Sequence, residues 1–270
     1  MLRQNKKMQL NKKKLQTRIK IIIIIIVLAV LGISWAIFTD IIKLRKTEDM
    51  VGSENAISIL FVGNSYVFVG SFPNQLQTIA RANDIEIIYK DISRHGNQGG
   101  TLSELREAAI IEMQSGRFDY VIFTCSGNRV ANDIDGFLNN VQILSNEARK
   151  NGVVPVLFNS AWTPDKENLN IATEAYKLAS DEFNVILANV ADAWAYAYQV
   201  VPEVELITKF DLRGPHPNDA GGFFTACVFA STLFDLHIEE IPNDSLYRGN
   251  NATTLAQVAW DFVHLSKYDD

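Results

Sequence analysis

The chain has 270 residues, of which 47% are apolar and 21% are charged. This composition supports a full-sized hydrophobic core and excludes intrinsic disorder for most of the chain. The first 20 residues hold eight Lys or Arg and no acid, so the rest of the chain has a formal charge of −14. A body this acidic argues against nucleic acid as a partner, because phosphate backbones attract basic surfaces. Cys125 and Cys227 are too few for a disulfide framework; buried free thiols are expected, and a disulfide between them is the alternative.

An uncharged apolar run of 18 residues, Ile21–Phe38, follows the basic segment. A helix of that length spans roughly 27 Å, close to the hydrocarbon thickness of a bilayer. We therefore expect a cytoplasmic tail (1–20), a transmembrane anchor (21–39), a polar linker (40–56) and an extracytoplasmic domain (57–270). A cleaved signal peptide and a buried core helix are the alternatives. The run is longer than the apolar region of a typical signal peptide, and it lacks the polar face that a core helix of a soluble domain usually has.

From Ile57 onward, short apolar runs alternate with longer segments typical of helices. Apolar, mostly β-branched runs predict strands at 57–63, 85–93, 119–126, 153–161 and 184–190. Helices are predicted at about 72–83, with Ser71 as N-cap, and at about 102–115, 134–150, 166–182, 219–235 and 252–266. A short helix that ends at about Trp194 is also predicted after the fifth strand. Alternation with fully apolar strands predicts a five-stranded, mostly parallel sheet covered on both faces, which is a three-layer α/β/α sandwich.

Ligands bind such a sheet beyond the carboxyl ends of its strands, so the loops that follow the strands are where chemistry is expected. Ser65 directly follows the first strand and can project its hydroxyl over that edge. A free hydroxyl is a weak nucleophile and needs a base. Among four histidines, His216 is the best candidate, because its Gly-Pro-His-Pro-Asn loop immediately precedes a helix. His95, on the same edge, is the second candidate.

Acyl transfer also needs hydrogen-bond donors for the developing oxyanion. The Gly99–Gly100 pair lets a backbone N–H approach a ligand closely, and Asn128 follows the third strand with a side-chain amide. The backbone N–H of Ser65 would be a third donor. Each residue alone has a simpler explanation as a turn, cap or surface residue. Their order along the chain favours the catalytic explanation.

Four segments together resemble the SGNH (GDSL-like) hydrolases: ILFVGNSYVF with Ser65, GGTL with Gly100, CSGN with Asn128 and GPHPNDAGG with His216. The resemblance implies a three-layer α/β/α fold and hydrolysis of esters or acyl groups. It also implies that Ser65 is the nucleophile, His216 the base, and Gly100, Asn128 and the Ser65 N–H the oxyanion hole.

One position departs from the family pattern. The acid that usually stands three residues before the histidine is replaced by Arg213, and Asp211 stands five before it. Asp211 is therefore the candidate third member of the triad, and a backbone carbonyl that orients His216 is the alternative.

We expect a membrane-anchored serine esterase that acts outside the membrane on an acylated small molecule, glycan or lipid. The alternatives are an O-acyltransferase on the same site and a catalytically inactive domain that binds glycans. The sequence lacks the Gly-Lys-Ser/Thr end of a P-loop motif and has no His-Glu-x-x-His motif. We therefore expect neither a cofactor nor a metal.

Overall fold

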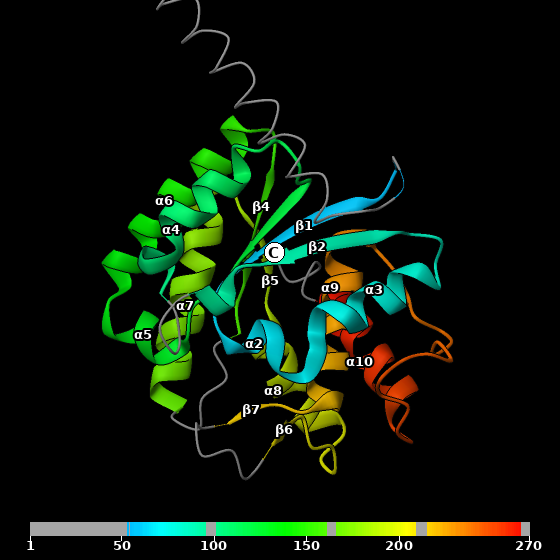
Figure 1. The fold of residues 1–270 in the computed structure, drawn as a ribbon. Helices are drawn as coiled ribbons and strands as arrows, with labels where there is room; N and C mark the ends of the chain where they lie inside the picture. Colours follow the sequence, from blue (N-terminus) through cyan, green and yellow to red (C-terminus); the bar gives the residue numbers. More distant parts are fainter. Residues whose placement is uncertain (1–52, 54, 96–100, 161–165, 209–214, 266–270) are drawn as a thin grey trace, which may run out of the picture. The chain divides into compact units, whose positions relative to one another are not determined.

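The computed structural model describes residues 53, 55–95, 101–160, 166–208 and 215–265, and the predicted anchor at 21–39 lies outside them. Five strands form a parallel sheet in the order β2-β1-β3-β4-β5 (Figure 1). The strands are β1 (Ile57–Val62), β2 (Ile87–Asp91), β3 (Tyr120–Phe123), β4 (Val154–Phe158) and β5 (Ile186–Ala188). Each predicted strand is present but one to four residues shorter than its apolar run, because pairing ends where the chain turns away from its neighbours.

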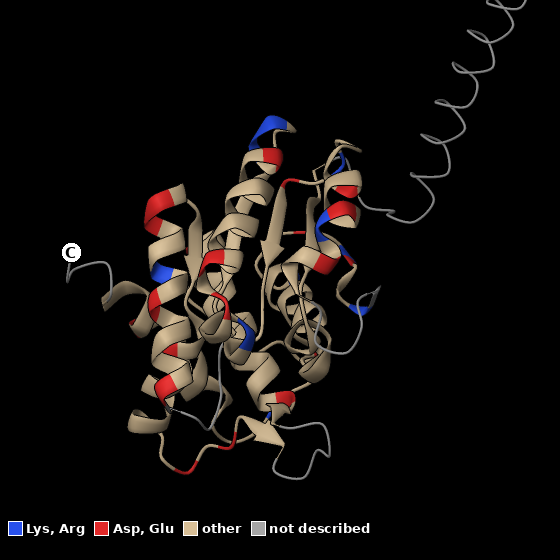
Figure 2. Cartoon of the chain, turned by 90° about the vertical axis from the view of Figure 1, so that its left-hand side faces the viewer, with Lys and Arg blue, Asp and Glu red and all other residues tan. Residues whose placement is uncertain are grey.

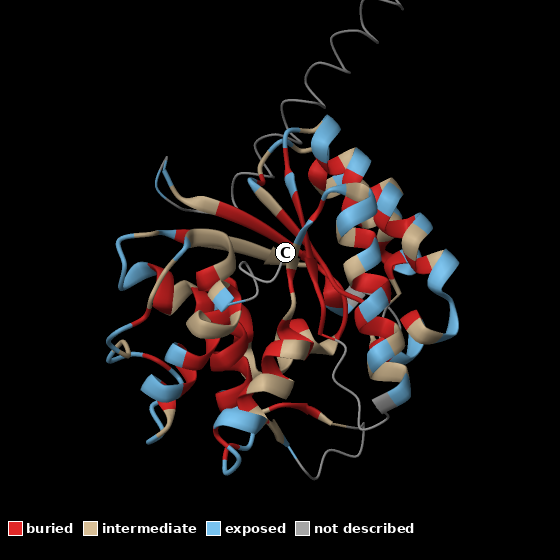
Figure 3. Ribbon diagram, turned by 180° about the vertical axis from the view of Figure 1, so that it is seen from behind, coloured by how far each residue is buried: buried red, intermediate tan, exposed pale blue. Residues whose placement is uncertain are grey.

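Two helical layers cover the sheet (Figures 1 and 3). One layer consists of α4 (Leu102–Met113), α5 (Gly127–Asn132), α6 (Ile134–Lys150) and α7 (Lys166–Phe183). The other consists of α3 (Phe72–Arg81), α8 (Val190–Val200), α9 (Asp219–Phe234) and α10 (Ala252–Leu265). Buried residues line the inner faces, and exposed residues follow the outer faces of the helices (Figure 3). The predicted α/β sandwich is confirmed.

Helix α9 is the central helix of its layer. Every residue from Ala220 to Ser231 is buried, because α3 and α10 pack on either side of it. A helix that is apolar all round is typical of such an interior position. On the other layer, acidic residues are spread along the lengths of the helices (Figure 2).

Short elements that the sequence did not predict gather beyond the carboxyl ends of the strands (Figure 1). They are α2 (Ser65–Phe68), η1 (Val69–Ser71), η2 (Ser93–His95), and the antiparallel pair β6 (Ile207–Thr208) and β7 (His216–Pro217). The expected N-cap bond of Ser71 is absent: Ser71 precedes α3 with a left-handed φ of 55° and its side chain caps no N–H of that described helix. Pro73 in the first turn of α3 has no N–H to be capped, which lowers the need for one.

Among the described residues, no helix is long and apolar enough to cross a membrane.

Candidate active site

Ser65 and His216 meet at the carboxyl edge of the sheet. The Nε2 atom of His216 lies 2.9 Å from the Oγ atom of Ser65, which is a hydrogen bond between residues 151 positions apart in the chain. His216 is 8% exposed, whereas Ser65 is half-buried. The arrangement pairs a hydroxyl with an imidazole that can remove its proton.

The turn that presents Ser65 depends on the two residues before it. A Cβ on Gly63 would lie 2.1 Å from Cγ2 of Thr124, at the end of the neighbouring strand, so only glycine fits there. Asn64 then caps α2: its Oδ1 accepts the N–H of Tyr66 at 2.9 Å. Its Nδ2 is buried and has no hydrogen-bond partner among the described residues. The cap places Ser65 at the first position of α2, directly over the sheet edge.

His216 is held by the residue two positions after it. The side chain of Asn218 accepts the N–H of Gly221 at 2.9 Å and so caps α9. Its Nδ2 donates to the carbonyl of Glu205 at 2.8 Å, and its backbone N–H donates to Leu206 O at 3.1 Å. The β7 segment is therefore tied both to α9 and to the chain just before β6.

Close backbone packing joins the segment after Ser65 to the segment after His216. Gly70 has a left-handed φ of 75°, and a Cβ on Gly222 would lie only 1.8 Å from Gly70 O. The buried amide of Gln75 donates to Gly70 O and to Asp219 O, both at 2.9 Å. These contacts hold α9 against η1, so packing of main chain on main chain contributes to the separation of Ser65 from His216.

The other candidate site residues are either outside the described part of the chain or not in contact with Ser65 in a described hydrogen bond. Gly100, Asp211 and Arg213 lie outside the described residues, as does the side chain of His95. Asn128 lies in the first turn of α5 and is exposed, and its Oδ1 accepts a hydrogen bond from Asn168 at 3.3 Å. Its amide N–H groups are the donors that an oxyanion would need. The roles of these residues stay predictions.

Tyr66 is a site residue that the sequence reasoning missed. Its hydroxyl donates to the backbone carbonyl of Pro215 at 3.0 Å, and its ring lies 6.1 Å from the His216 ring, centroid to centroid. Burial raises the pKa of the Tyr66 hydroxyl. Its place beside Ser65 was the only available signal, because no local pattern connects it with Pro215.

Both cysteines are free and buried, as expected. Burial raises the pKa of each thiol. The backbone N–H of Cys125 donates to the Tyr176 hydroxyl at 2.7 Å, and that hydroxyl donates to Cys125 O at 3.0 Å. This reciprocal pair fixes the chain that leads from β3 to Asn128.

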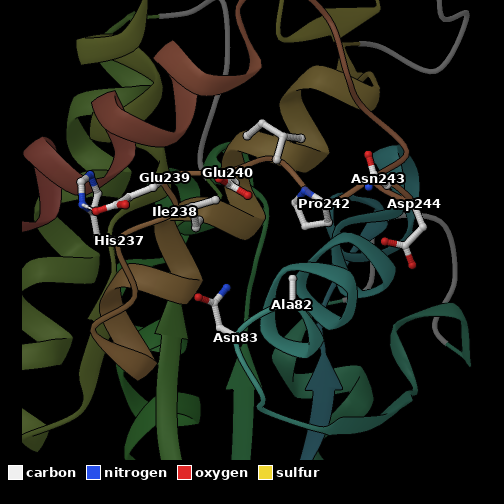
Figure 4. Close-up of a pocket in the computed structure, with 10 residues that line it drawn as sticks. Ala82, Asn83, His237, Ile238, Glu239, Glu240, Pro242, Asn243 and Asp244 are labelled. Atoms are coloured by element: carbon white, nitrogen blue, oxygen red, sulfur yellow. Dashed lines mark ion pairs between the residues drawn. The ribbon is translucent and has the colours of Figure 1, made fainter.

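A separate hollow of about 600 Å³ is lined by residues of the α3 end and of the segment after α9, including His237, Glu239 and Asp244 (Figure 4). His216 precedes the N-terminus of α9 and this hollow adjoins its C-terminus. The 16 residues of α9 make a helix roughly 24 Å long. Nε2 of His237 lies 2.8 Å from Oε1 of Gln257, so this histidine stands near the opposite end of α9 from His216.

Comparison with known proteins identifies the fold. No protein-family model matches the chain, and no curated protein matches its sequence. Solved structures do match. A DUF4886 family protein from Bacteroides uniformis is 14% identical, with a TM-score of 0.59 over 80% of this chain and 96% of that one. A candidate SGNH hydrolase from Slackia heliotrinireducens is 22% identical, with a TM-score of 0.52 over 66% of this chain and 100% of that one.

A psychrotrophic esterase from Pseudoalteromonas sp., in a structure inhibited by monoethylphosphonate, is 14% identical. Its TM-score is 0.51 over 66% of this chain and 97% of that one. At these identities the likeness establishes the fold: the chain has the α/β fold found in SGNH hydrolases and esterases.

Proposed function

We propose that the chain is a serine esterase with Ser65 as nucleophile and His216 as general base. The observation that carries the proposal is the 2.9 Å hydrogen bond between Ser65 Oγ and His216 Nε2 at the carboxyl edge of a parallel sheet. The fold shared with a solved esterase supports it.

The chemistry proceeds in two halves. Nε2 of His216 takes the hydroxyl proton while Oγ of Ser65 bonds to the ester carbonyl carbon, and the carbonyl oxygen becomes an oxyanion. His216 then gives its proton to the leaving alcohol as the ester C–O bond breaks, which leaves an acyl-serine. Water then attacks the acyl group while His216 takes one of its protons, and His216 returns that proton to Oγ of Ser65 as the acyl–Oγ bond breaks and the acid is released. We assign the oxyanion donors to the N–H of Ser65, the amide of Asn128 and the N–H of Gly100, and the orientation of His216 to Asp211.

The test is covalent labelling of Ser65. A fluorophosphonate probe should label the wild-type domain at Ser65, as read by peptide mass spectrometry. Ser65→Ala and His216→Ala should abolish labelling and turnover of a chromogenic acetate ester. The matched control is Ser103→Ala, which removes an exposed hydroxyl from the first turn of α4 and should leave both unchanged. A folded wild type that is neither labelled nor active would refute the esterase and favour a glycan-binding domain.

We further infer that the domain acts outside the cell membrane, where its substrate is an acylated small molecule, glycan or lipid. The inference rests on the basic segment and the 18-residue apolar run of the sequence. Protease added to intact cells should digest the domain, and a chain starting at Thr47 should be released from the membrane fraction with its ester turnover intact. Protection from protease in intact cells would overturn this placement.

A further inference from the structure

The residue after the proposed nucleophile is bonded to the residue before the proposed base. Tyr66 follows Ser65, and its hydroxyl donates to the carbonyl of Pro215, which precedes His216. We propose that Tyr66 is a positioning residue that sets the distance between Ser65 and His216. This inference rests on the proposed function and adds a residue to it.

Four residues form a closed ring. Peptide bonds join Ser65 to Tyr66 and Pro215 to His216. Hydrogen bonds of 3.0 Å, from Tyr66 to Pro215 O, and of 2.9 Å, between His216 and Ser65, complete the ring. Because two of the four links are covalent, the position of the Tyr66 hydroxyl constrains the separation of Oγ from Nε2. Removing that hydroxyl leaves the catalytic hydrogen bond without its parallel link.

The Tyr66 ring is itself held in place. Its centroid lies 6.4 Å from the Trp194 ring and 6.1 Å from the His216 ring. Trp194 is 1% exposed, and a Cβ on Gly221 would lie 3.0 Å from its Cη2 atom, so α9 packs closely on the indole. The cap from Asn64 to the Tyr66 N–H holds the other end of the residue. The hydroxyl therefore projects toward Pro215 from a fixed ring.

The hydroxyl acts as a donor and takes no proton. Burial raises the pKa of Tyr66, so the hydroxyl keeps its proton throughout the pH range in which an imidazole can serve as base. Its partner is a backbone carbonyl, which accepts hydrogen bonds and does not titrate. Loss of the bond therefore displaces His216 without changing the charge of the site. Misplacement of a reacting group by about 1 Å can lower a rate by about 100-fold.

Tyr66→Phe isolates the hydroxyl, because phenylalanine keeps the ring packing. Tyr89→Phe is the matched control: the Tyr89 hydroxyl donates to Asn74 Oδ1 at 2.6 Å, and Tyr89 lies on the edge strand β2. Both variants would be compared with the wild type in Tm, in kcat and KM on a short-chain ester, and in the rate constant for fluorophosphonate labelling of Ser65.

We expect Tyr66→Phe to lower kcat and the labelling rate constant by about 10- to 100-fold. KM should stay within about twofold, and Tm should fall no further than in Tyr89→Phe, whose kcat should equal that of the wild type. Unchanged labelling and kcat in Tyr66→Phe would overturn the positioning role. An increase in KM with unchanged kcat would overturn it as well, because it would make Tyr66 a substrate-binding residue.

Failure of the proposed function is a separate outcome. If wild-type Ser65 is not labelled, the esterase proposal fails, and a crystal structure of Tyr66→Phe tests the positioning role without any activity. An Oγ–Nε2 distance that lengthens from 2.9 Å to beyond hydrogen-bond range supports the role, whereas an unchanged distance overturns it.

Discussion

Replacing Gly222 with alanine should have two opposing effects on stability, one through helix propensity and one through packing. Gly222 lies in the first turns of α9, where propensity alone predicts that alanine stabilises the helix by about 1 kcal/mol. The structure predicts the opposite. An alanine Cβ would lie 1.8 Å from Gly70 O and 2.6 Å from Gly70 C. These are backbone atoms and cannot rotate away, so α9 or η1 must move by roughly 1.5 Å to reach an ordinary contact distance.

The expected loss of stability follows from three contributions. Overpacking in a well-packed interior costs about 1–3 kcal/mol. The displacement also weakens the two hydrogen bonds from Gln75 to Gly70 O and Asp219 O, each of which contributes about 1 kcal/mol. The gain in helix propensity offsets about 1 kcal/mol of this. The free energy of unfolding should therefore fall by roughly 3 kcal/mol, which corresponds to a decrease in Tm of about 6–12 °C in a domain of this size.

The substitution should also lower kcat in the protein that remains folded. α9 begins three residues after His216, so the same displacement lengthens the 2.9 Å contact with Ser65. We expect kcat to fall about 100-fold at 20 °C in protein that is still folded. Urea denaturation gives the free energy of unfolding, far-UV circular dichroism verifies folding, and turnover of an acetate ester gives kcat.

Gly152→Ala is the control for this experiment. Gly152 has a φ of +73°, and a Cβ at this position would meet no heavy atom of the described residues within 4 Å. The variant should lose about 1 kcal/mol through backbone strain and keep wild-type kcat. A Gly222→Ala variant as stable as the wild type would refute the claim that main-chain packing at Gly70 holds α9 in place.

Three further predictions concern single side chains. Asn128→Ala should lower kcat by roughly 10²–10³-fold with little change in Tm, because the side chain is exposed; an unchanged kcat would remove Asn128 from the oxyanion hole. Asp211→Asn should lower kcat by an amount approaching the roughly 10⁴-fold seen in a serine protease triad, and a fall below about tenfold would assign the orientation of His216 to a backbone carbonyl. Cys227 should resist iodoacetamide at pH 8 until the chain unfolds, since burial raises the pKa of its thiol well above the ordinary value for cysteine. At a pH above that ordinary value the unfolded thiol ionises and the folded one does not, so the free energy of unfolding should fall as pH rises, and less steeply in Cys227→Ser; equal slopes would contradict this.

The strands and the long helices could be predicted from local pattern. A strand buried on both faces needs an apolar run, as in Ile57–Val62, and a helix needs its buried residues on one side, as in α6. Ser65 could be singled out because it follows such a run directly. Helix α2 and the β6–β7 pair were missed. Helix α2 has four residues, and β6 and β7 have two each, so these elements are too short to show a periodic pattern.

The contact between Ser65 and His216 depends on the tertiary structure alone. The two residues are 151 positions apart, and their separation depends in part on Gly70 packing on Gly222 and on the amide of Gln75 bridging η1 and α9. Sequence pattern reports which residues are buried and with what period, because these follow from local geometry. It does not report which backbone atoms meet across the core. That is decided by the packing of whole layers, and it is this packing that placed Tyr66 against Pro215.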